Sequence, residues 1–152
     1  MKQSQNKYVN NDREKRRVLV GGCFDLLHYG HIQFLEEAKK MGDWLVVALE
    51  SDENVRRMKG ESRPIHTQEQ RKSMLEAISC VDEVIALPPI QGHQKYYNLV
   101  SRVHPQVIAV TQGDPKETNK REQAEKIGAT LVVIPKIPTP STSQLAKLLG
   151  LE

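Results

Sequence analysis

Short apolar runs alternate with amphipathic segments along most of this chain, and this alternation limits the folds open to it. The segments between the runs carry apolar residues at helical spacing, as Ile32, Leu35 and Ala38 do. Strands that are joined through helices form parallel sheets with helices on both faces. The sequence therefore predicts an α/β fold, a single doubly wound Rossmann-like domain with a five-stranded parallel sheet. The expected strands are 17–22, 44–50, 81–87, 107–110 and 130–134.

Residues that begin or end helices mark the expected helical segments. Thr67, with Gln70 three positions later, forms a capping box, and Ser141 is a second N-cap. Gly42 follows the first amphipathic segment, where glycine readily takes the left-handed conformation that ends a helix. We expect a helical start and then a mobile basic loop over 54–66. Further helices are expected over 30–40, 67–78, 97–103, 117–127 and 141–149.

Length and composition bound what the chain can be. Its 152 residues suit one domain, which we expect over 16–152, behind a flexible polar lead-in over 1–15. A basic arm that binds nucleic acid is the alternative for this lead-in. Two cysteines make no disulfide framework, no apolar run is long enough to cross a bilayer, and the net charge is only +3. We expect a cytoplasmic protein with no nucleic-acid and no membrane partner.

The loop between the first strand and the first helix carries the strongest functional signal. Glycines at a strand end let the backbone approach a ligand closely, and a helix N-terminus favours anions. His28 and His31 lie at that N-terminus and would add donors for phosphate oxygens. We therefore favour phosphate chemistry for this loop. Its sequence is Gly21-Gly22-Cys23-Phe24-Asp25-Leu26-Leu27-His28-Tyr29-Gly30-His31.

Three other interpretations of the loop compete with this one. One histidine could cap the helix while the other packs. His28, His31 and Cys23 could bind zinc, although no further ligand at suitable spacing is visible. A dinucleotide fingerprint would need G-x-G-x-x-G, which this loop does not supply.

The segment from Gly22 to His31 resembles the signature of the cytidylyltransferase-like family, whose core is H-x-G-H. The resemblance extends over nearly the whole chain from Arg17 onward. It implies the same doubly wound fold and a nucleotidyltransferase, in which the phosphate of an acceptor attacks the α-phosphorus of a nucleoside triphosphate and pyrophosphate leaves. Further stretches agree in order and spacing: Lys59-Gly60-Glu61-Ser62-Arg63-Pro64, Glu69-Gln70-Arg71 and Ser141-Thr142-Ser143.

The resemblance also implies a role for individual residues. His28, His31 and Lys59 would be catalytic, because they would bind phosphate oxygens and stabilise the charge of the transition state. Lys59 and Arg63 would bind the acceptor, and Arg71 would hold the β- and γ-phosphates with its guanidinium fork. The nucleotide site would comprise Gly22, Cys23, Phe24, His28, His31, Arg71, Gly113, Asp114, Ser141, Thr142 and Ser143.

The resemblance implies no direct bond between a side chain and a metal ion. A magnesium ion would bridge the phosphates and be held mainly by the nucleotide and water, so we predict no protein metal site. Asp25 would be structural, with its carboxylate bonding loop amides. A solvated surface charge is the alternative for each basic residue, a plain N-cap for Ser141 to Ser143, and a simple turn for Asp114.

The resemblance leaves several substrates open. ATP is favoured over CTP as the donor, and heptose 1-phosphate is the acceptor we favour. The reason is that the stretches 59–64 and 69–71 look most like heptose 1-phosphate adenylyltransferase domains. Glycerol-3-phosphate cytidylyltransferases and the synthetases that adenylylate FMN share the signature. A nucleotide-binding regulatory module without catalysis is the alternative from another class. A homodimer is expected by analogy with the family.

Overall fold

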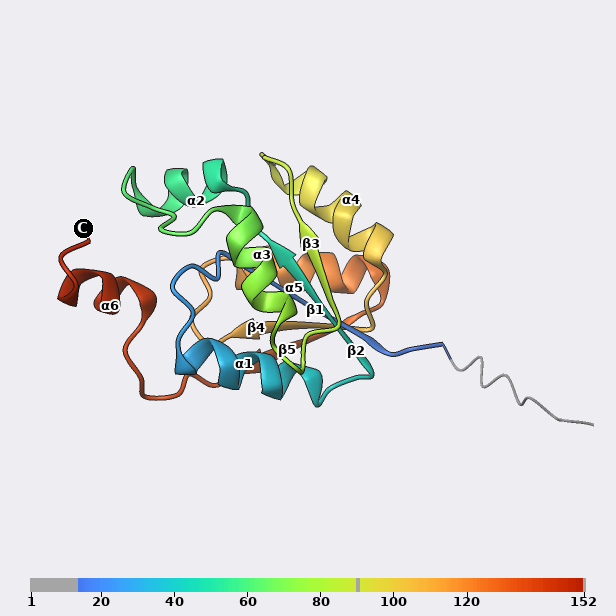
Figure 1. The fold of residues 1–152 in the computed structure, drawn as a ribbon. Coiled ribbons are helices and arrows are strands. Elements are labelled where there is room, and N and C mark those ends of the chain that lie inside the picture. The colour runs from blue at the N-terminus through green and yellow to red at the C-terminus, as the bar shows by residue number, and fades with distance from the viewer. Residues whose placement is uncertain (1–13, 90, 152) are drawn as a thin grey trace, which may run out of the picture.

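Strands alternate with helices, with two consecutive helices after the second strand, along the part of the chain that the computed structural model describes, residues 14–89 and 91–151 (Figure 1). The first half contains β1 (Arg17–Gly22), α1 (Tyr29–Lys39), β2 (Trp44–Leu49), α2 (Asp52–Lys59), α3 (Gln68–Glu76) and β3 (Glu83–Ala86). The second half contains α4 (His93–Val103), β4 (Val107–Thr111), α5 (Glu117–Ile127), β5 (Thr130–Ile134) and α6 (Thr142–Leu148). Most of the lead-in that the sequence predicts, residues 1–13, lies outside the described residues.

The strands form one parallel sheet in the order β3-β2-β1-β4-β5. In β1, Val18 pairs with Leu45 of β2 on one side and with Val107 of β4 on the other. The chain thus moves outward from β1 in both directions, and the order reverses between β1 and β4. In sheets of this kind, ligands bind beyond the carboxyl ends of the strands at such a reversal. The predicted fold class is confirmed.

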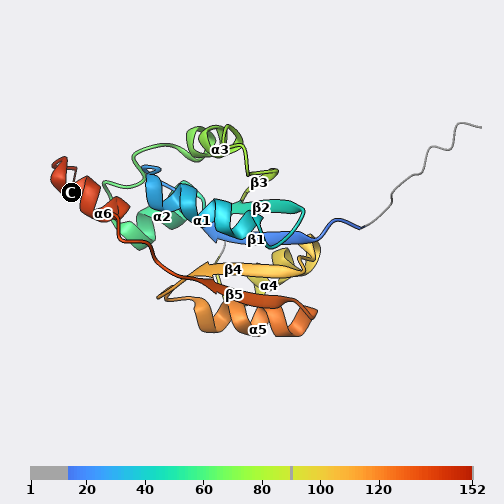
Figure 2. The same cartoon turned by 90° about the horizontal axis from the view of Figure 1, so that it is seen from below.

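Two apolar layers hold the helices against the sheet. Alternate strand residues such as Val18 and Val47 face a layer that includes Leu35 of α1 and Leu75 of α3. The intervening strand residues face a layer that includes Val100 of α4 and Ala124 of α5. Figure 2 shows α1 and α3 on one side of the sheet and α4 and α5 on the other, with α2 and α6 beyond the carboxyl ends of the strands. Strands buried on both faces explain the continuous apolar runs of the sequence.

Two local expectations differ from the structure. Gly42 does not take a left-handed conformation, because α1 ends at Lys39 with Lys40 as its C-cap in the right-handed region. Glycine is needed there for packing, since a Cβ atom at Gly42 would lie 2.5 Å from the carbonyl oxygen of Arg16. Helix α4 begins at His93 rather than near Tyr97, and it therefore carries one more turn toward the carboxyl edge of the sheet. In the described part of the chain, no helix is long and apolar enough to cross a membrane.

Candidate active site

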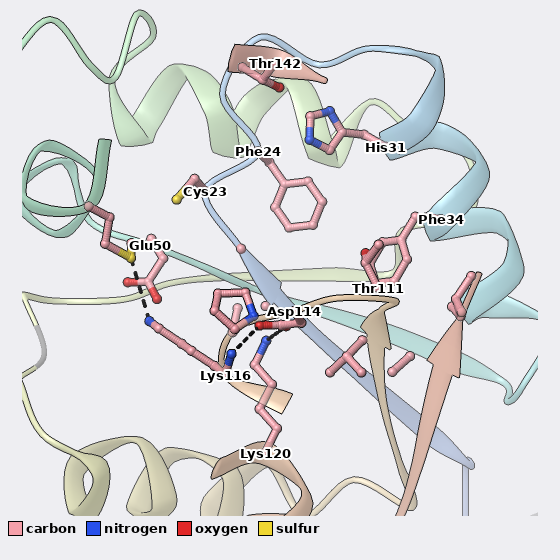
Figure 3. A pocket seen from close by; sticks show the side chains of 18 of the residues that line it. Cys23, Phe24, His31, Phe34, Glu50, Thr111, Asp114, Lys116, Lys120 and Thr142 are labelled. Atoms are coloured by element: carbon pink, nitrogen blue, oxygen red, sulfur yellow. Dashed lines mark hydrogen bonds and ion pairs between the residues drawn. The ribbon is translucent and has the colours of Figure 1, made fainter. Parts of the chain in front are cut away.

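A cleft of about 1190 Å³ opens at the carboxyl edge of the sheet, at the point where the strand order reverses (Figure 3). The chain positions that line it come from β1, β2, β4, the helices on both faces and the start of α6. Most of the site residues predicted from the sequence meet here. They are Gly22, Cys23, Phe24, His28, His31, Lys59, Arg63, Asp114, Ser141, Thr142 and Ser143. Arg71 and Gly113 are not among the lining residues.

The loop from β1 to α1 has an unusual backbone. Phe24 and Leu26 have φ angles of 47° and 50°, in the left-handed region that residues with side chains rarely occupy. Such conformations cost roughly 1–3 kcal/mol each and are concentrated at functional sites. Gly30 is required by close packing, because a Cβ atom there would lie 2.8 Å from the His28 ring and 2.9 Å from Thr139. The shape of this loop explains why a glycine separates the two histidines.

The two histidines cap α1 and lie against each other. Nδ1 of His28 accepts the N–H of Gly30 at 3.0 Å, and Nδ1 of His31 accepts the N–H of His28 at 3.2 Å. Their ring centroids are 4.0 Å apart. Because each Nδ1 accepts a hydrogen bond, the ring proton of each neutral imidazole lies on Nε2. Each ring therefore keeps an Nε2–H donor for a ligand while its other nitrogen serves the helix.

Both imidazoles are held in the neutral form. Burial lowers the pKa of His28 below its ordinary value. Burial also lowers the pKa of His31, and the neighbouring His28 lowers it further, to about 4, although Asp25 acts in the opposite direction. The pair thus presents neutral N–H donors at the N-terminus of a helix, which suits phosphate oxygens. The capping alternative is also correct for His28, and the two roles use different nitrogens.

Asp25 joins this loop to the segment that follows α2. Its carboxylate accepts the backbone N–H groups of Ile65 at 2.8 Å and His66 at 3.1 Å, and a hydrogen bond from Arg63. The structural role that the sequence predicts for Asp25 is confirmed. Thr142 adds a second link, because its hydroxyl donates to the carbonyl oxygen of Asp25 at 3.0 Å. The N-terminus of α6 is held against the same loop.

Arg71 corrects a prediction. Its side chain is 1% exposed and does not point into the cleft. Its guanidinium donates to the carbonyl oxygens of His66 and Cys23 and to the carboxylate of Asp52, at 3.0, 2.7 and 2.7 Å. Through these three hydrogen bonds, Arg71 joins the loop after β1, the start of α2 and the segment before α3. The sequence could not show this, because an arginine in a matched motif can bind either a phosphate or a carbonyl.

Four other predicted residues line the cleft, and three of them also bond to other groups of the protein. Lys59 is exposed at the end of α2 and lines the cleft. Arg63 also lines it, but its Nε is bonded to Asp25. Ser141 is the N-cap of α6, as its simpler alternative proposed. Asp114 lies in a turn that Gly113 makes with φ 80°, and its carboxylate pairs with Lys120 at 2.7 Å.

Magnesium and zinc place different demands on this cleft. In the described residues, no group of three or more His, Cys, Asp or Glu side chains is arranged to hold a metal ion. The zinc alternative for Cys23, His28 and His31 therefore has no support. A magnesium ion that arrives on the phosphates of a nucleotide needs no such group. The N–H donors of the cleft would then bind the phosphate oxygens and leave the ion to the nucleotide and water.

The lining includes polar residues to which the sequence interpretation gave no role, and three of them matter below. Glu50 follows β2, Tyr96 lies in α4, and Lys116 comes just before α5. A carboxylate that directly follows a buried strand was a usable signal for Glu50. The expected helix began one residue after Tyr96, and the sequence interpretation assigned no individual role to this side chain. Lys116 lies just before the expected helix 117–127, and only the fold brings it close to Met58 of α2.

Comparison with known proteins identifies the group to which this fold and site belong. Residues 19–145 match the family described as Cytidylyltransferase-like. The chain is also similar to proteins named "Bifunctional protein HldE". The protein of Geotalea uraniireducens is 38% identical over 135 residues, which is 88% of this chain and 26% of that protein. The protein of Wolinella succinogenes is 41% identical over 120 residues, 79% of this chain and 23% of that one.

Solved structures show the same architecture. A lipopolysaccharide core biosynthesis protein from Thermoplasma volcanium has a TM-score of 0.66 and 28% identity, over 83% of this chain and 99% of that chain. A pantoate-beta-alanine ligase from Francisella tularensis has a TM-score of 0.58 and 14% identity, over 84% and 62% of the two chains. The second likeness concerns the fold alone. The chain spans only about a quarter of the length of the curated relatives named above.

Proposed function

Since this chain belongs to the cytidylyltransferase-like family of nucleotidyltransferases, we propose that it transfers AMP from ATP to a sugar 1-phosphate and releases pyrophosphate. Heptose 1-phosphate is the acceptor we favour. One observation carries the proposal: His28 and His31 present two neutral Nε2–H donors at the start of α1, in the cleft where the strand order reverses. Such donors stabilise negative charge that develops on phosphate oxygens.

The proposed reaction needs no covalent intermediate with the protein. An oxygen of the acceptor phosphate forms a bond to the α-phosphorus of ATP, and the bond from that phosphorus to the β-phosphate oxygen breaks. Pyrophosphate takes the electron pair of the broken bond. The protein would contribute positioning and charge stabilisation, which supply most of the catalysis in phosphoryl and nucleotidyl transfer. His28 and His31 would donate to oxygens of the triphosphate, and Lys59 would neutralise the acceptor phosphate or the α-phosphate.

Magnesium belongs to this proposal as a cofactor that the nucleotide carries. When bound between the phosphates, the ion supplies charge neutralisation and a fixed phosphate geometry. Two carboxylates that line the cleft are already bonded within the protein. Asp25 is occupied by three hydrogen bonds, and Asp114 is paired with Lys120.

The choice of a sugar 1-phosphate rests on three similarities. The stretch from Lys59 to Pro64 resembles heptose 1-phosphate adenylyltransferase domains, and the two relatives described above, each more than a third identical over the aligned residues, are named HldE. The Thermoplasma volcanium relative is named for lipopolysaccharide core biosynthesis. Glycerol 3-phosphate with CTP, FMN with ATP, and a regulatory module that binds nucleotide without turnover are the alternatives. A cytoplasmic homodimer without nucleic-acid or membrane partners is part of the same proposal.

Pyrophosphate release tests this proposal. The purified chain is incubated with magnesium and each pair of ATP or CTP with heptose 1-phosphate, glycerol 3-phosphate or FMN. We expect release above the acceptor-free rate with ATP and heptose 1-phosphate. Release only with another pair would show that the protein catalyses the proposed type of reaction on different substrates. Nucleotide binding without release in any pair would favour the regulatory module. Sedimentation of the same sample tests the homodimer.

A further inference from the structure

Glu50 is a buried carboxylate without a cationic partner. The residue is 6% exposed and lies at the carboxyl end of β2, on the wall of the cleft. Its Oε1 accepts the hydroxyl of Tyr96, and its Oε2 accepts the side-chain N–H of Asn54 at 2.9 Å. Within residues 14–89 and 91–151, no Lys, Arg or His nitrogen lies within 4.0 Å of it. Burying a carboxylate among neutral partners is costly, which points to a use for it.

The hydrogen bonds of Glu50 leave it able to accept more. A carboxylate has about four acceptor positions, of which Tyr96 and Asn54 take two. Burial raises the pKa of the Tyr96 phenol, and the bond to Glu50 raises it further, so this hydroxyl stays a donor to Glu50. Because the Glu50 side chain lines the cleft, its other acceptor positions can be reached by a ligand. Hydrogen-bond donors of a ligand are the groups that fit them.

Lys116 supplies the opposite charge next to Glu50 and Tyr96. Its Nζ lies 3.7 Å from the sulfur of Met58 and 5.5 Å from the centre of the Tyr96 ring. In the described chain, no carboxylate oxygen lies within 4.0 Å of that Nζ. Figure 3 shows the Lys116 side chain reaching across the cleft toward α2, on the side of Glu50 and away from His31. The ammonium group is thus available to an anion.

These side chains lie on the other side of the sheet from the histidines. Phe24, which contacts the His31 ring at a centroid distance of 5.5 Å, belongs to the apolar layer of α1 and α3. Tyr96 packs against the layer of α4 and α5. The cleft therefore has two halves that meet at the ends of β1 and β4. If the histidine half binds the triphosphate, the other half faces the acceptor.

We propose that Glu50 and Lys116 form the acceptor subsite, in which Glu50 accepts hydrogen bonds from hydroxyl groups of the acceptor and Lys116 binds its phosphate. This inference rests on the proposed function and adds the residues that select the acceptor. The carboxylate repels an acceptor with a second anionic group at that position. The ammonium group of Lys116 already lies near the Tyr96 ring and disfavours a cationic acceptor there. A polyol with one phosphate fits both groups, because its hydroxyls donate to Glu50 and its phosphate pairs with Lys116.

Two substitutions with matched controls test the subsite. Glu50→Gln keeps the size of the side chain and removes its charge, and its control is Glu53→Gln, an exposed position of α2. Lys116→Met keeps the stem and removes the ammonium group. Its control is Lys126→Met, because Lys126 lies 5.2 Å from the Tyr97 ring and does not line the cleft. Equal melting temperatures would establish that each variant is folded.

Steady-state kinetics with ATP and heptose 1-phosphate give the first readout. Glu50→Gln and Lys116→Met should raise the KM of the sugar phosphate by about tenfold or more, the loss expected for a hydrogen bond to a charged group. The KM of ATP should change by less than about twofold, since neither substitution removes a group that is proposed to bind ATP. The control variants should match the wild type. A raised KM for ATP with an unchanged KM for the sugar phosphate would overturn the proposal.

Calorimetric binding gives a second readout that does not require turnover. Heptose 1-phosphate, inorganic phosphate and 2-aminoethyl phosphate are titrated into the protein with magnesium and a non-hydrolysable ATP analogue. Both variants should weaken the sugar phosphate, and only Lys116→Met should weaken inorganic phosphate. Tighter binding of the amine than of the sugar phosphate, or no binding of the sugar phosphate to the wild type, would overturn the subsite. A protein that binds as expected but releases no pyrophosphate would contradict the proposed function alone.

Discussion

The carboxylate of Asp25 accepts a hydrogen bond of 2.7 Å from Nε of Arg63, and both side chains are almost completely buried, at 0% and 5% exposure. The pair joins the histidine loop after β1 to the basic segment after α2. These segments are 38 residues apart in the sequence and supply different residues to the cleft. This contact and the backbone N–H groups of Ile65 and His66, which also donate to Asp25, therefore help to fix the histidine loop relative to the basic segment. The hydrogen bonds of Arg71 contribute to the same arrangement.

Removing the charge of Asp25 should destabilise the protein. In Asp25→Asn, the buried Arg63 guanidinium loses its counter-ion, and we expect the free energy of unfolding to fall by about 3 kcal/mol. Urea denaturation measures the change. Asp114→Asn, whose ion pair with Lys120 is also partly buried but outside this contact, is the comparison and should lose less. Equal stability of Asp25→Asn and the wild type would contradict the role assigned to the pair.

Acid should weaken the same contact. Burial alone would raise the pKa of Asp25, but the hydrogen bonds from Ile65, Arg63 and His66 outweigh it and hold the pKa below its ordinary value of 3.8. The contribution of the carboxylate to stability is therefore complete above pH 3.8 and is lost as the pH falls through the lower native value. Denaturation at a series of pH values measures this. In Asp25→Asn, the part of the acid dependence that comes from this group should be absent.

The roles of the two ring nitrogens of His28 can be tested separately by substitution. Asparagine is a good N-cap, so His28→Asn should keep the cap of α1 and lose only the Nε2–H donor. We expect its turnover to fall by about 10²–10³-fold with nearly unchanged stability. His28→Ala should lose the same activity and also about 1 kcal/mol of stability. Pyrophosphate release and thermal unfolding are the measurements. Wild-type turnover in His28→Asn would refute the catalytic role of this side chain.

The protonation of His31 is open to direct measurement. Its pKa is lowered to about 4, so nitrogen-15 spectra of labelled histidine should show the neutral Nε2–H form from pH 8 down to pH 5. His31→Ala assigns the signal. Unfolded chains take up this proton near the ordinary value of 6.5 while the native protein does not, so stability falls as the pH drops from 6.5 toward 4. A signal that titrates near 6.5 in the folded protein would contradict this electrostatic picture.

Arg71 should govern stability rather than nucleotide affinity. Arg71→Lys removes the planar fork that reaches three acceptors, and we expect a loss of at least about 2 kcal/mol in the free energy of unfolding. The KM of ATP in the folded variant should stay unchanged. Lys72→Ala, at the next position of α3, is the control and should have little effect on either quantity. A raised KM for ATP with full stability would restore the phosphate role for Arg71.

Sequence patterns predict the sheet and the helices of this molecule better than the contacts within the site. The continuous apolar strands predict the sheet, and the caps at Thr67 and Ser141 predict the starts of α3 and α6, because burial on both faces and capping leave local signals. The roles of Arg71 and Gly42 depend on contacts with distant backbone oxygens, which no local pattern encodes. The same holds for Lys116, whose neighbours Met58 and Tyr96 come from two other helices.

The central claim is that the chain moves the nucleoside monophosphate of ATP onto the phosphate of an acceptor. Two parallel reactions with heptose 1-phosphate and magnesium test it directly, one with ATP labelled at the α-phosphorus and one with ATP labelled at the γ-phosphorus. We predict that the α label appears in a nucleotide sugar and the γ label in pyrophosphate. Transfer of the γ label to the sugar phosphate, or release of the α label as AMP without a sugar product, would contradict the account.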